Sequence, residues 1–78
     1  MYVYILRSKS RPEQRYVGVT TNLEERLIRH NAGESYHTAK YMPWEIETSI
    51  HFSDPAKALR FEIYLKSGSG LAFRNRHF

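Results

Sequence analysis

Residues 2–20 read YVYILRSKSRPEQRYVGVT, and this stretch decides the fold. Both of its ends are rich in β-branched and aromatic residues, which predicts strands over residues 2–6 and 15–20. The polar segment between them, residues 8–14, contains Pro12 and is too short for a crossover connection. The two strands are therefore predicted to be antiparallel neighbours.

A helix is predicted directly after the second strand. Thr21 and Asn22 are both good N-cap residues, and Thr21 with Glu24 has capping-box spacing. Glu24 and Glu25 place negative charge in the first turn, where it opposes the positive end of the helix dipole. Gly33 is a suitable residue to follow the last turn, so the helix is expected to stop near it.

The second half of the chain predicts one more strand and one or two helices. After a polar, irregular segment over residues 34–43, alternation predicts a strand over 44–52. Asp54-Pro55 is a strong helix start, and the helix continues to about Lys66. Residues 69–77 add a short terminal helix. The order β-β-α-β-α-(α) predicts a single α+β domain over residues 1–78, a three-stranded antiparallel sheet with two to three helices packed on it.

Composition narrows the class of protein. The chain has 78 residues, no cysteine and a net charge of +4, with eight of its twelve cationic side chains being arginine. No disulfide or cysteine-ligated zinc can stabilise it, and no apolar run is long enough to span a membrane. We therefore expect a cytoplasmic protein with a polyanionic partner such as nucleic acid. The basic excess lies near the two ends of the sequence, with Arg7, Lys9, Arg11 and Arg15 in the first part and Lys66, Arg74 and Arg76 in the last.

Glu62 is the most unusual residue of the second predicted helix. On a helical wheel it lies near the middle of an apolar arc formed by Ala58, Leu59, Phe61, Ile63 and Leu65. A carboxylate is costly to desolvate there unless it is paired or binds a metal. Glu62 is thus either a structural partner of an arginine or a tyrosine hydroxyl, or a functional carboxylate.

Arg26 and His30 give the first predicted helix a similar feature. They are four residues apart, so they share one face, and His30 lies beside the apolar Leu23. Both side chains are expected where this helix meets the sheet. An interfacial histidine that simply satisfies its hydrogen bonds is the structural alternative.

Tyrosine is frequent on the predicted strands. Tyr2 and Tyr4 share one strand face, and Tyr16 lies on the neighbouring strand. Ordinary strand packing accounts for such tyrosines, but a hydroxyl on the helix-covered face would come near Arg26 and His30. Gly18 within a strand indicates a bulge or a close backbone approach. Together, an arginine, a histidine, tyrosines and a carboxylate suffice for metal-assisted phosphodiester hydrolysis.

These residues resemble the pattern of the GIY-YIG nuclease domain superfamily, in its short stand-alone bacterial members related to the excinuclease C subunit. Tyr2-Val3-Tyr4 resembles the first family element, with tyrosine in place of its glycine, and Tyr16-Val17-Gly18 resembles the second. The stretch 20–31 resembles the family's first helix, and Glu62 stands where the family keeps a glutamate. Val19 occupies a position at which some members have a lysine.

The resemblance implies an endonuclease that hydrolyses DNA phosphodiester bonds with Mg²⁺ or Mn²⁺, in DNA repair or recombination. It implies that Arg26 neutralises the scissile phosphate and that Glu62 coordinates the metal. Tyr16 with help from His30 would act as general base and Tyr4 would hold the water or the phosphate, although any of these three could be the base. The resemblance also implies further phosphate contacts for Tyr36 and His37, and it implies that Asn75 is the substrate-binding polar amide that several branches have near the C-terminus.

Two other functions stay open at this stage. The chain could be a nucleic-acid-binding module that keeps the fold and cleaves poorly, or a small subunit that uses the fold for protein contacts. So short a chain has little surface for choosing a substrate. Specificity would therefore come from this one face, from a homo-oligomer or from a protein partner.

Overall fold

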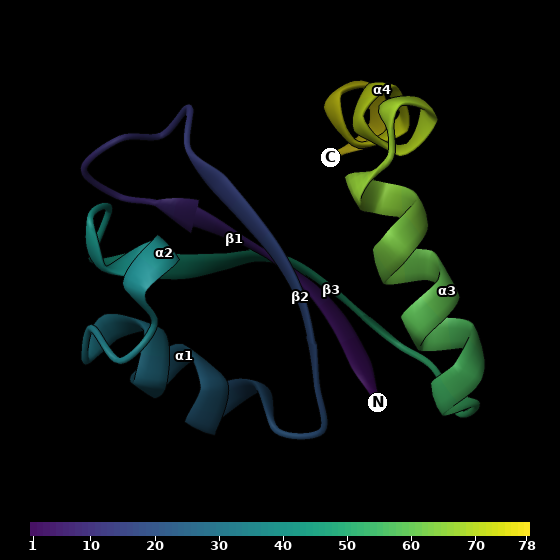
Figure 1. The fold of residues 1–78 in the computed structure, drawn as a ribbon, viewed down its shortest axis with the longest axis horizontal. Helices are drawn as coiled ribbons and strands as arrows, with labels where there is room; N and C mark the ends of the chain where they lie inside the picture. The colour runs from purple at the N-terminus through teal and green to yellow at the C-terminus, as the bar shows by residue number, and fades with distance from the viewer.

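The first strand is the centre of the sheet. In the computed structural model, which describes residues 1–78, β1 (Tyr2–Ser8) lies between β2 (Arg15–Thr20) and β3 (Trp44–His51). Both neighbours run antiparallel to it (Figure 1). The predicted hairpin and three-stranded antiparallel sheet are confirmed, and β2 and β3 are left as the two edges.

The register between β1 and β2 sorts side chains onto two faces. Tyr4 pairs with Gly18 and Leu6 with Tyr16, so Tyr4, Leu6 and Tyr16 lie on the same face because side chains alternate along a strand. The residues between them, such as Ile5 and its partner Val17, lie on the opposite face. A shift of one residue would exchange the two sets.

A β-bulge interrupts the pairing of β1 with β3. Ile5 pairs with Thr48, but Leu6 pairs with Ile46, which leaves Glu47 as an extra residue in β3. The simple alternation expected for residues 44–52 is therefore wrong at this one position. The bulge keeps Ile46 on the face of Leu6 and gives Glu47 a different set of neighbours.

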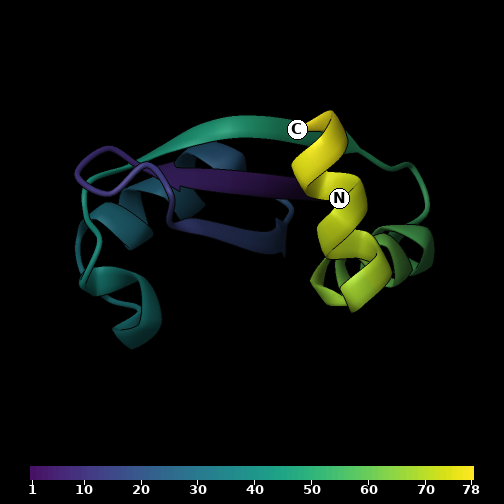
Figure 2. The same ribbon diagram turned by 90° about the horizontal axis from the view of Figure 1, so that it is seen from above.

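Each face of the sheet carries its own pair of helices. α1 (Leu23–Asn31) and the short α2 (Tyr36–Ala39) lie on one side, where Tyr4, Leu6 and Trp44 form a buried cluster. α3 (Pro55–Lys66) and α4 (Gly68–His77) lie on the other, over a core of Val3, Ile5, Val17, Ala58 and Leu65. Figure 2 shows the two helix pairs at opposite ends of the molecule. The predicted element order is confirmed, with α2 added in the segment expected to be irregular.

Local chemistry defines the helix ends. Asn22 caps α1 by accepting a hydrogen bond from the Glu25 amide, so the expected Thr21–Glu24 capping box is wrong. Asp54 caps α3 in the same way, with Pro55 in the first turn as predicted. Gly33 has a φ of 75°, the left-handed conformation that ends many helices.

The apolar arc predicted for α3 is too broad. Leu59 and Ile63 are 46% and 66% exposed, whereas Ala58 and Leu65 are buried. The helix packs on a narrow three-stranded sheet, so a single stripe of its surface is covered and the flanks face solvent. Glu62 therefore lies at the edge of the buried stripe and not at its centre.

None of the four helices is long and apolar enough to cross a membrane. The longest, α3, has 12 residues, whereas a membrane-spanning helix needs about 20.

Gly70 lets α4 cross closely over the end of α3, and this contact yields a prediction for stability. A Cβ at Gly70 would overlap the backbone of Tyr64 and Leu65, whereas a Cβ at Gly68 would meet no atom within 4 Å. We expect Gly70→Ala to lower the free energy of unfolding by about 1–3 kcal/mol, as overpacking does. Gly68→Ala, the matched control, should change it by less than about 0.5 kcal/mol. Urea unfolding followed by circular dichroism measures both, and equal values for the two variants would contradict the close crossing.

Candidate active site

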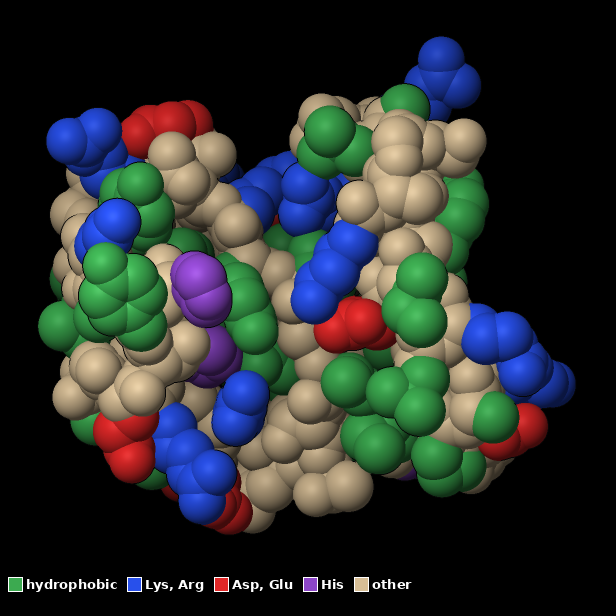
Figure 3. Space-filling model, viewed as in Figure 1, with side chains coloured by type: hydrophobic (Ala, Val, Ile, Leu, Met, Phe, Trp, Pro, Cys, Tyr) green, Lys and Arg blue, Asp and Glu red, His purple; other side chains and the backbone are tan.

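The residues singled out from the sequence meet along the edge strand β2. In Figure 1 this strand lies in front, between the α1–α2 side and the α3–α4 side. Figure 3 shows a hollow there, with Lys and Arg side chains gathered along it. Five of the predicted site residues border this region from four different elements: Tyr4, Tyr16, Arg26, His30 and Glu62.

Gly18 creates the space that Tyr4 occupies. The two residues are cross-strand partners, and a Cβ on Gly18 would overlap the Tyr4 hydroxyl and crowd the Tyr16 ring. The close approach predicted for this glycine is confirmed. The alternative, a β-bulge at Gly18, is wrong, because the bulge of this sheet lies in β3. As a result the hydroxyl end of the Tyr4 ring lies over Gly18, and the ring centroid is 6.3 Å from that of Tyr16.

The Tyr4 hydroxyl joins two side chains of α1. It lies 3.0 Å from Nε2 of His30 and accepts a hydrogen bond from Nε of Arg26 at 3.3 Å. Tyr4 and His30 are each 1% exposed, so these contacts are shielded from water. The expectation that Arg26 and His30 emerge where α1 meets the sheet is confirmed. Tyr2 does not join them, because it packs edge-on against His51.

Hydrogen bonds on the far side of the imidazole determine its tautomer. His30 Nδ1 lies 2.9 Å from Oγ1 of Thr38, and that hydroxyl donates to the Ser35 carbonyl oxygen. Since the hydroxyl proton is directed at Ser35, Thr38 Oγ1 accepts from His30, and Nδ1 carries the ring proton. Nε2 is then the acceptor for the Tyr4 hydroxyl. His30 is thus held in the orientation in which it can take a proton from Tyr4.

Electrostatics keep this pair uncharged at neutral pH. Burial, and then the positive charge of Arg26, lower the pKa of His30 from its ordinary value. Burial raises the pKa of Tyr4, against the opposing effect of Arg26. The hydrogen bond with Tyr4 raises the pKa of Arg26, so the guanidinium remains the fixed positive charge of the site.

Tyr16 differs from Tyr4 in having an uncommitted hydroxyl. Its ring centroid lies 5.0 Å from that of His30, and its hydroxyl makes no hydrogen bond of full geometry, although it is close enough to help raise the pKa of Arg26. Its side chain is only partly buried. Tyr16 is therefore the tyrosine with a hydroxyl free to contact a water molecule or a substrate.

Glu62 reaches the same region from α3. Its Oε2 accepts from Lys66 Nζ at 2.9 Å, and Lys66 lies 5.8 Å from the centre of the Tyr16 ring. The Glu62 side chain is 16% exposed, and its charge is close enough to contribute to the raised pKa of Tyr4. The structural alternative, a pairing of Glu62 with an arginine or a tyrosine hydroxyl, is wrong in its partner, because Glu62 pairs with Lys66.

A metal ion would find few protein ligands here. No three His, Asp or Glu side chains are grouped closely enough to enclose one. Oε1 of Glu62 is not used by Lys66, so one carboxylate oxygen remains to bind a cation. Such a site suits an ion that keeps most of its water, as Mg²⁺ does.

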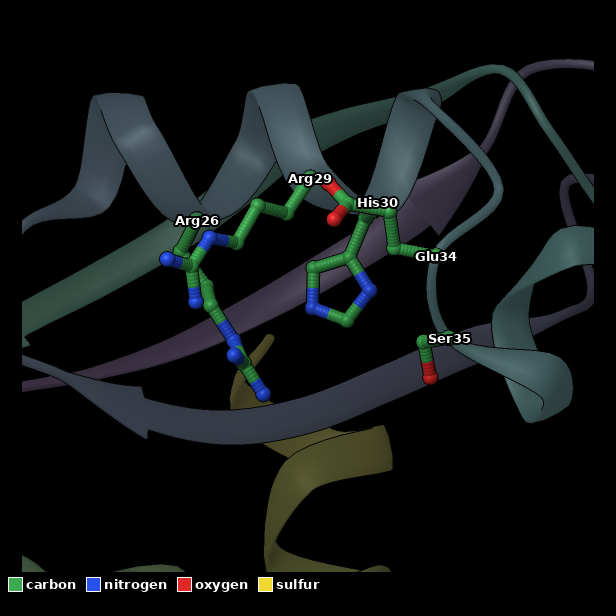
Figure 4. A pocket seen from close by; sticks show the side chains of 5 residues that line it. All are labelled: Arg26, Arg29, His30, Glu34 and Ser35. Atoms are coloured by element: carbon green, nitrogen blue, oxygen red, sulfur yellow. The ribbon is translucent and has the colours of Figure 1, made fainter.

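A polar cavity of about 370 Å³ opens beside His30, between the end of α1 and the start of α2. Figure 4 shows the Arg26 side chain and the His30 ring extending from α1 into it, with Ser35 across the opening. Its lining contains no hydrophobic side chain and consists of Arg26, Arg29, His30, Glu34 and Ser35. The cavity has the size and polarity to admit a phosphate group and its water shell.

Sequence reasoning missed three residues of this region. Lys66 could have been found, because it follows Glu62 by four residues, the spacing of a helical ion pair. Arg29 lines the cavity, but it lies on the solvent side of α1 and pairs with Glu25. In the sequence it therefore looks like an ordinary surface ion pair. The sequence does not indicate a role for Thr38, because its hydrogen bond with His30 forms only when the segment after α1 folds back onto this helix.

The three further substrate contacts implied by the resemblance, Tyr36, His37 and Asn75, lie outside this cluster. Tyr36 is 76% exposed and contacts its neighbours His37 and Lys40. Asn75 is exposed on α4. None of these side chains makes a hydrogen bond or an aromatic contact with the five clustered residues, so the structure does not bring them together.

Comparisons with known proteins identify the family of the chain. The GIY-YIG catalytic domain family matches residues 1–74. A UPF0213 protein of Staphylococcus haemolyticus is 36% identical over 69 residues, which is 87% of this chain and 82% of that protein. No solved structure matches the chain.

Larger proteins contain a similar segment. Structure-specific endonuclease subunit SLX1 of Debaryomyces hansenii is 39% identical over 67 residues, or 77% of this chain, and that of Candida dubliniensis is 35% identical over 82 residues, or 96% of it. The chain spans only 19% and 27% of these two relatives. The family match covers nearly the whole sequence, so the chain belongs to the GIY-YIG catalytic domain family.

Proposed function

We propose that the chain is a metal-dependent endonuclease that hydrolyses phosphodiester bonds of DNA. The observation that carries the proposal is the buried Tyr4–His30 pair, bonded to Arg26 and placed beside the free hydroxyl of Tyr16 and the carboxylate of Glu62. Hydrolysis of a phosphodiester needs a fixed positive charge, a proton acceptor and a water nucleophile. This cluster provides the positive charge and the proton acceptor beside an open cavity.

Arg26 would neutralise the phosphate in this mechanism. Its guanidinium is oriented by the bond from Nε to Tyr4, which leaves its terminal nitrogens for phosphate oxygens. Charge develops on those oxygens as the water oxygen attacks phosphorus and the P–O bond to the leaving group breaks. A guanidinium already in position stabilises that charge without reorganising.

Tyr16 is the proposed general base, and His30 supports it. The Tyr16 hydroxyl is free, whereas the Tyr4 hydroxyl is occupied by Arg26 and His30 and has a raised pKa. Tyr16 would act as the phenolate and take the proton from the water, while the neutral His30, which accepts from Tyr4 through Nε2, adds no positive charge beside the Tyr16 ring, 5.0 Å away between centroids. Tyr4 would orient Arg26 and His30 toward the phosphate. The alternative is that Tyr4 or His30 itself acts as the general base, and tyrosine variants distinguish the two mechanisms.

Glu62 would hold the divalent metal, Mg²⁺ or Mn²⁺, through its uncommitted carboxylate oxygen. When bound, such an ion supplies positive charge that stabilises the phosphate and the departing oxygen. Lys66 would be displaced from the carboxylate or shared with the phosphate. This pair is partly exposed, so exchanging its partner requires little rearrangement.

DNA is the proposed substrate because two relatives are called structure-specific endonuclease subunits and because the chain carries a net charge of +4. Branched DNA arising in repair or recombination would be the corresponding substrate. A non-catalytic nucleic-acid-binding module with this fold is the second candidate, and the cluster of a neutral imidazole, a free hydroxyl and a carboxylate argues against it.

Glu62→Gln tests the metal site. Nicking and cutting of single-stranded, duplex and branched DNA are measured with Mg²⁺ or Mn²⁺ and with EDTA. We expect the variant to lose about 10²–10³-fold in rate, the scale of removing one group that stabilises transition-state charge. Glu13→Gln, on the exposed hairpin, is the matched control and should cut normally. Equal rates for wild type and Glu62→Gln would disprove the metal assignment, and binding without cleavage under every condition would favour the binding module.

Tyrosine variants separate the proposed base from its support. Tyr16→Phe should lower kcat by about 10²–10⁴-fold, the range for loss of a proton-transfer group, without lowering the melting temperature by more than a few degrees. Tyr4→Phe should lower both activity and melting temperature, because it leaves His30 Nε2 and Arg26 without a partner. Tyr2→Phe, which leaves the ring contact with His51, is the control. Full activity in Tyr16→Phe would move the base to Tyr4 or His30.

The lowered pKa of His30 predicts a pH dependence of stability. The unfolded chain binds a proton at His30 at a higher pH than the folded chain, so stability is fully present above the unfolded pKa of about 6.5 and falls as the pH drops below it. The loss amounts to about 1.4 kcal/mol for each unit by which the pKa is lowered. Urea unfolding between pH 7.5 and pH 5 should show this slope in wild type and in His37→Gln, an exposed control, and a smaller slope in His30→Gln. The same slope in His30→Gln as in wild type would show that His30 is not the group responsible.

A further inference from the structure

Two arginines pair with one glutamate on the sheet face opposite Tyr4, and a third arginine lies nearby. Glu47, the extra residue of the β-bulge, accepts from Arg15 at 3.0 Å and from Arg7 at 3.3 Å. Arg74 of α4 is near enough for its pKa to be affected by both Arg15 and Glu47. The two basic ends of the sequence thus meet in space, and we call Arg7, Arg15, Arg74 and Glu47 the arginine cluster.

The arginine cluster contains hydrogen-bond donors that the fold does not use. Arg7 and Arg15 share the Glu47 carboxylate, and Glu45 is the residue paired with Arg7 across the strands. Nε of Arg74 is buried without a hydrogen-bond partner, and burial together with Arg15 lowers the pKa of this guanidinium. The Arg7 side chain is 44% exposed and that of Arg15 19%, so an anion can approach from solvent.

A purely structural role accounts for part of the arginine cluster. Arg15 links Glu47 to the carbonyl oxygen of Phe78 and so ties the end of α4 to the sheet. This link needs one arginine. Arg7, whose side chain is 44% exposed, and Arg74, whose Nε has no hydrogen-bond partner, keep donors that this link does not use and that an anion can accept from.

The arginine cluster adjoins the candidate active site through the edge strand. Arg15 and Tyr16 are consecutive in β2, with side chains on opposite faces and backbones about 3.3 Å apart along the strand. Because β2 has no strand on its outer side, both faces border the same edge. Lys66 lies beside Tyr16 along this edge, and Figure 3 shows positive side chains along the hollow.

We propose that the arginine cluster binds a backbone phosphate of the nucleic acid that flanks the scissile phosphate. This inference rests on the proposed function for its position, since the strand held at Arg26 would cross the edge of β2 to reach Arg15. Arginine is suited to such a contact because its planar donors match two phosphate oxygens at once. Contacts of this kind position the strand without reading its bases.

Salt-dependent binding tests the proposal independently of cleavage. Binding of a fluorescent branched or duplex DNA is measured in the Glu62→Gln background between 50 and 200 mM salt. Arg7→Gln and Arg74→Gln should each weaken binding several-fold and reduce the slope of log K against log salt by about 0.7–0.9, the share of one phosphate contact. Arg60→Gln, an exposed site on α3, removes the same charge and is the control.

Two further readouts separate positioning from folding. In otherwise wild-type protein, Arg7→Gln should raise KM for DNA and leave kcat within about two-fold, because this contact is made equally in the ground and transition states. Glu47→Gln removes the opposing charge and should strengthen DNA binding even if it lowers the melting temperature. A merely structural cluster predicts weaker or unchanged binding in that variant.

The failures are distinguishable. If the chain cuts DNA but Arg7→Gln binds with the affinity and salt slope of Arg60→Gln, the arginine cluster has no phosphate and the proposal is overturned. If the chain binds DNA with the predicted slopes and never cuts it, the proposed function fails and the arginine cluster stands as a nucleic-acid contact. Displacement of DNA by millimolar inorganic phosphate equally in Arg7→Gln and wild type would also overturn the proposal.

Discussion

The structure depends on the pairing of Tyr4 with Gly18. This single register position brings a large ring over a strand residue that has no side chain, and it places the Tyr4 hydroxyl where α1 can supply Arg26 and His30. The same pairing directs the alternate residues of both strands into the core beneath α3. A domain this small buries few side chains, so one contact serves both the packing and the chemistry.

The edge strand β2 is the boundary between two differently built halves. The α1–α2 side contributes buried polar groups joined in a hydrogen-bonded chain from Arg26 to Ser35, and the α3–α4 side contributes an apolar core with charged groups at its rim. Reactive groups on the first side are fixed by burial, whereas Glu62 and Lys66 on the second remain exchangeable at the surface. Under the proposed function, such a division would hold the guanidinium that faces the phosphate rigid and leave the carboxylate that binds the cation adjustable.

Much of the fold could be predicted from the sequence because its local signals agree. The hairpin, the cap at Asp54 and the glycine after α1 each depend on neighbouring residues, and all three are found as expected. The breadth of the buried stripe on α3 could not be predicted, because it depends on the width of the sheet beneath. The position of the bulge at Glu47 likewise depends on pairing between distant strands.

The sequence was enough to predict which residues form the candidate site, but not which hydrogen bonds join them. Arg26, His30 and Glu62 are conspicuous as polar residues next to apolar stripes, and periodicity is enough to find them. The bond from Thr38 that orients His30, and the difference between the engaged Tyr4 and the free Tyr16, arise only when four segments assemble. Neither can be read from spacing within one element.

The bulge in β3 has a consequence for how this strand can change in length. Because Glu47 has no partner residue on β1, a chain lacking it would keep Ile46 opposite Leu6 and Thr48 opposite Ile5. Loss of a residue elsewhere in β3 would instead shift the register of one end of the strand by one residue. The side chains of that end would move to the other face of the sheet, which would expose Trp44 or Ile46. The backbone can therefore dispense with position 47, and what would disappear with it is the carboxylate that holds the arginines together.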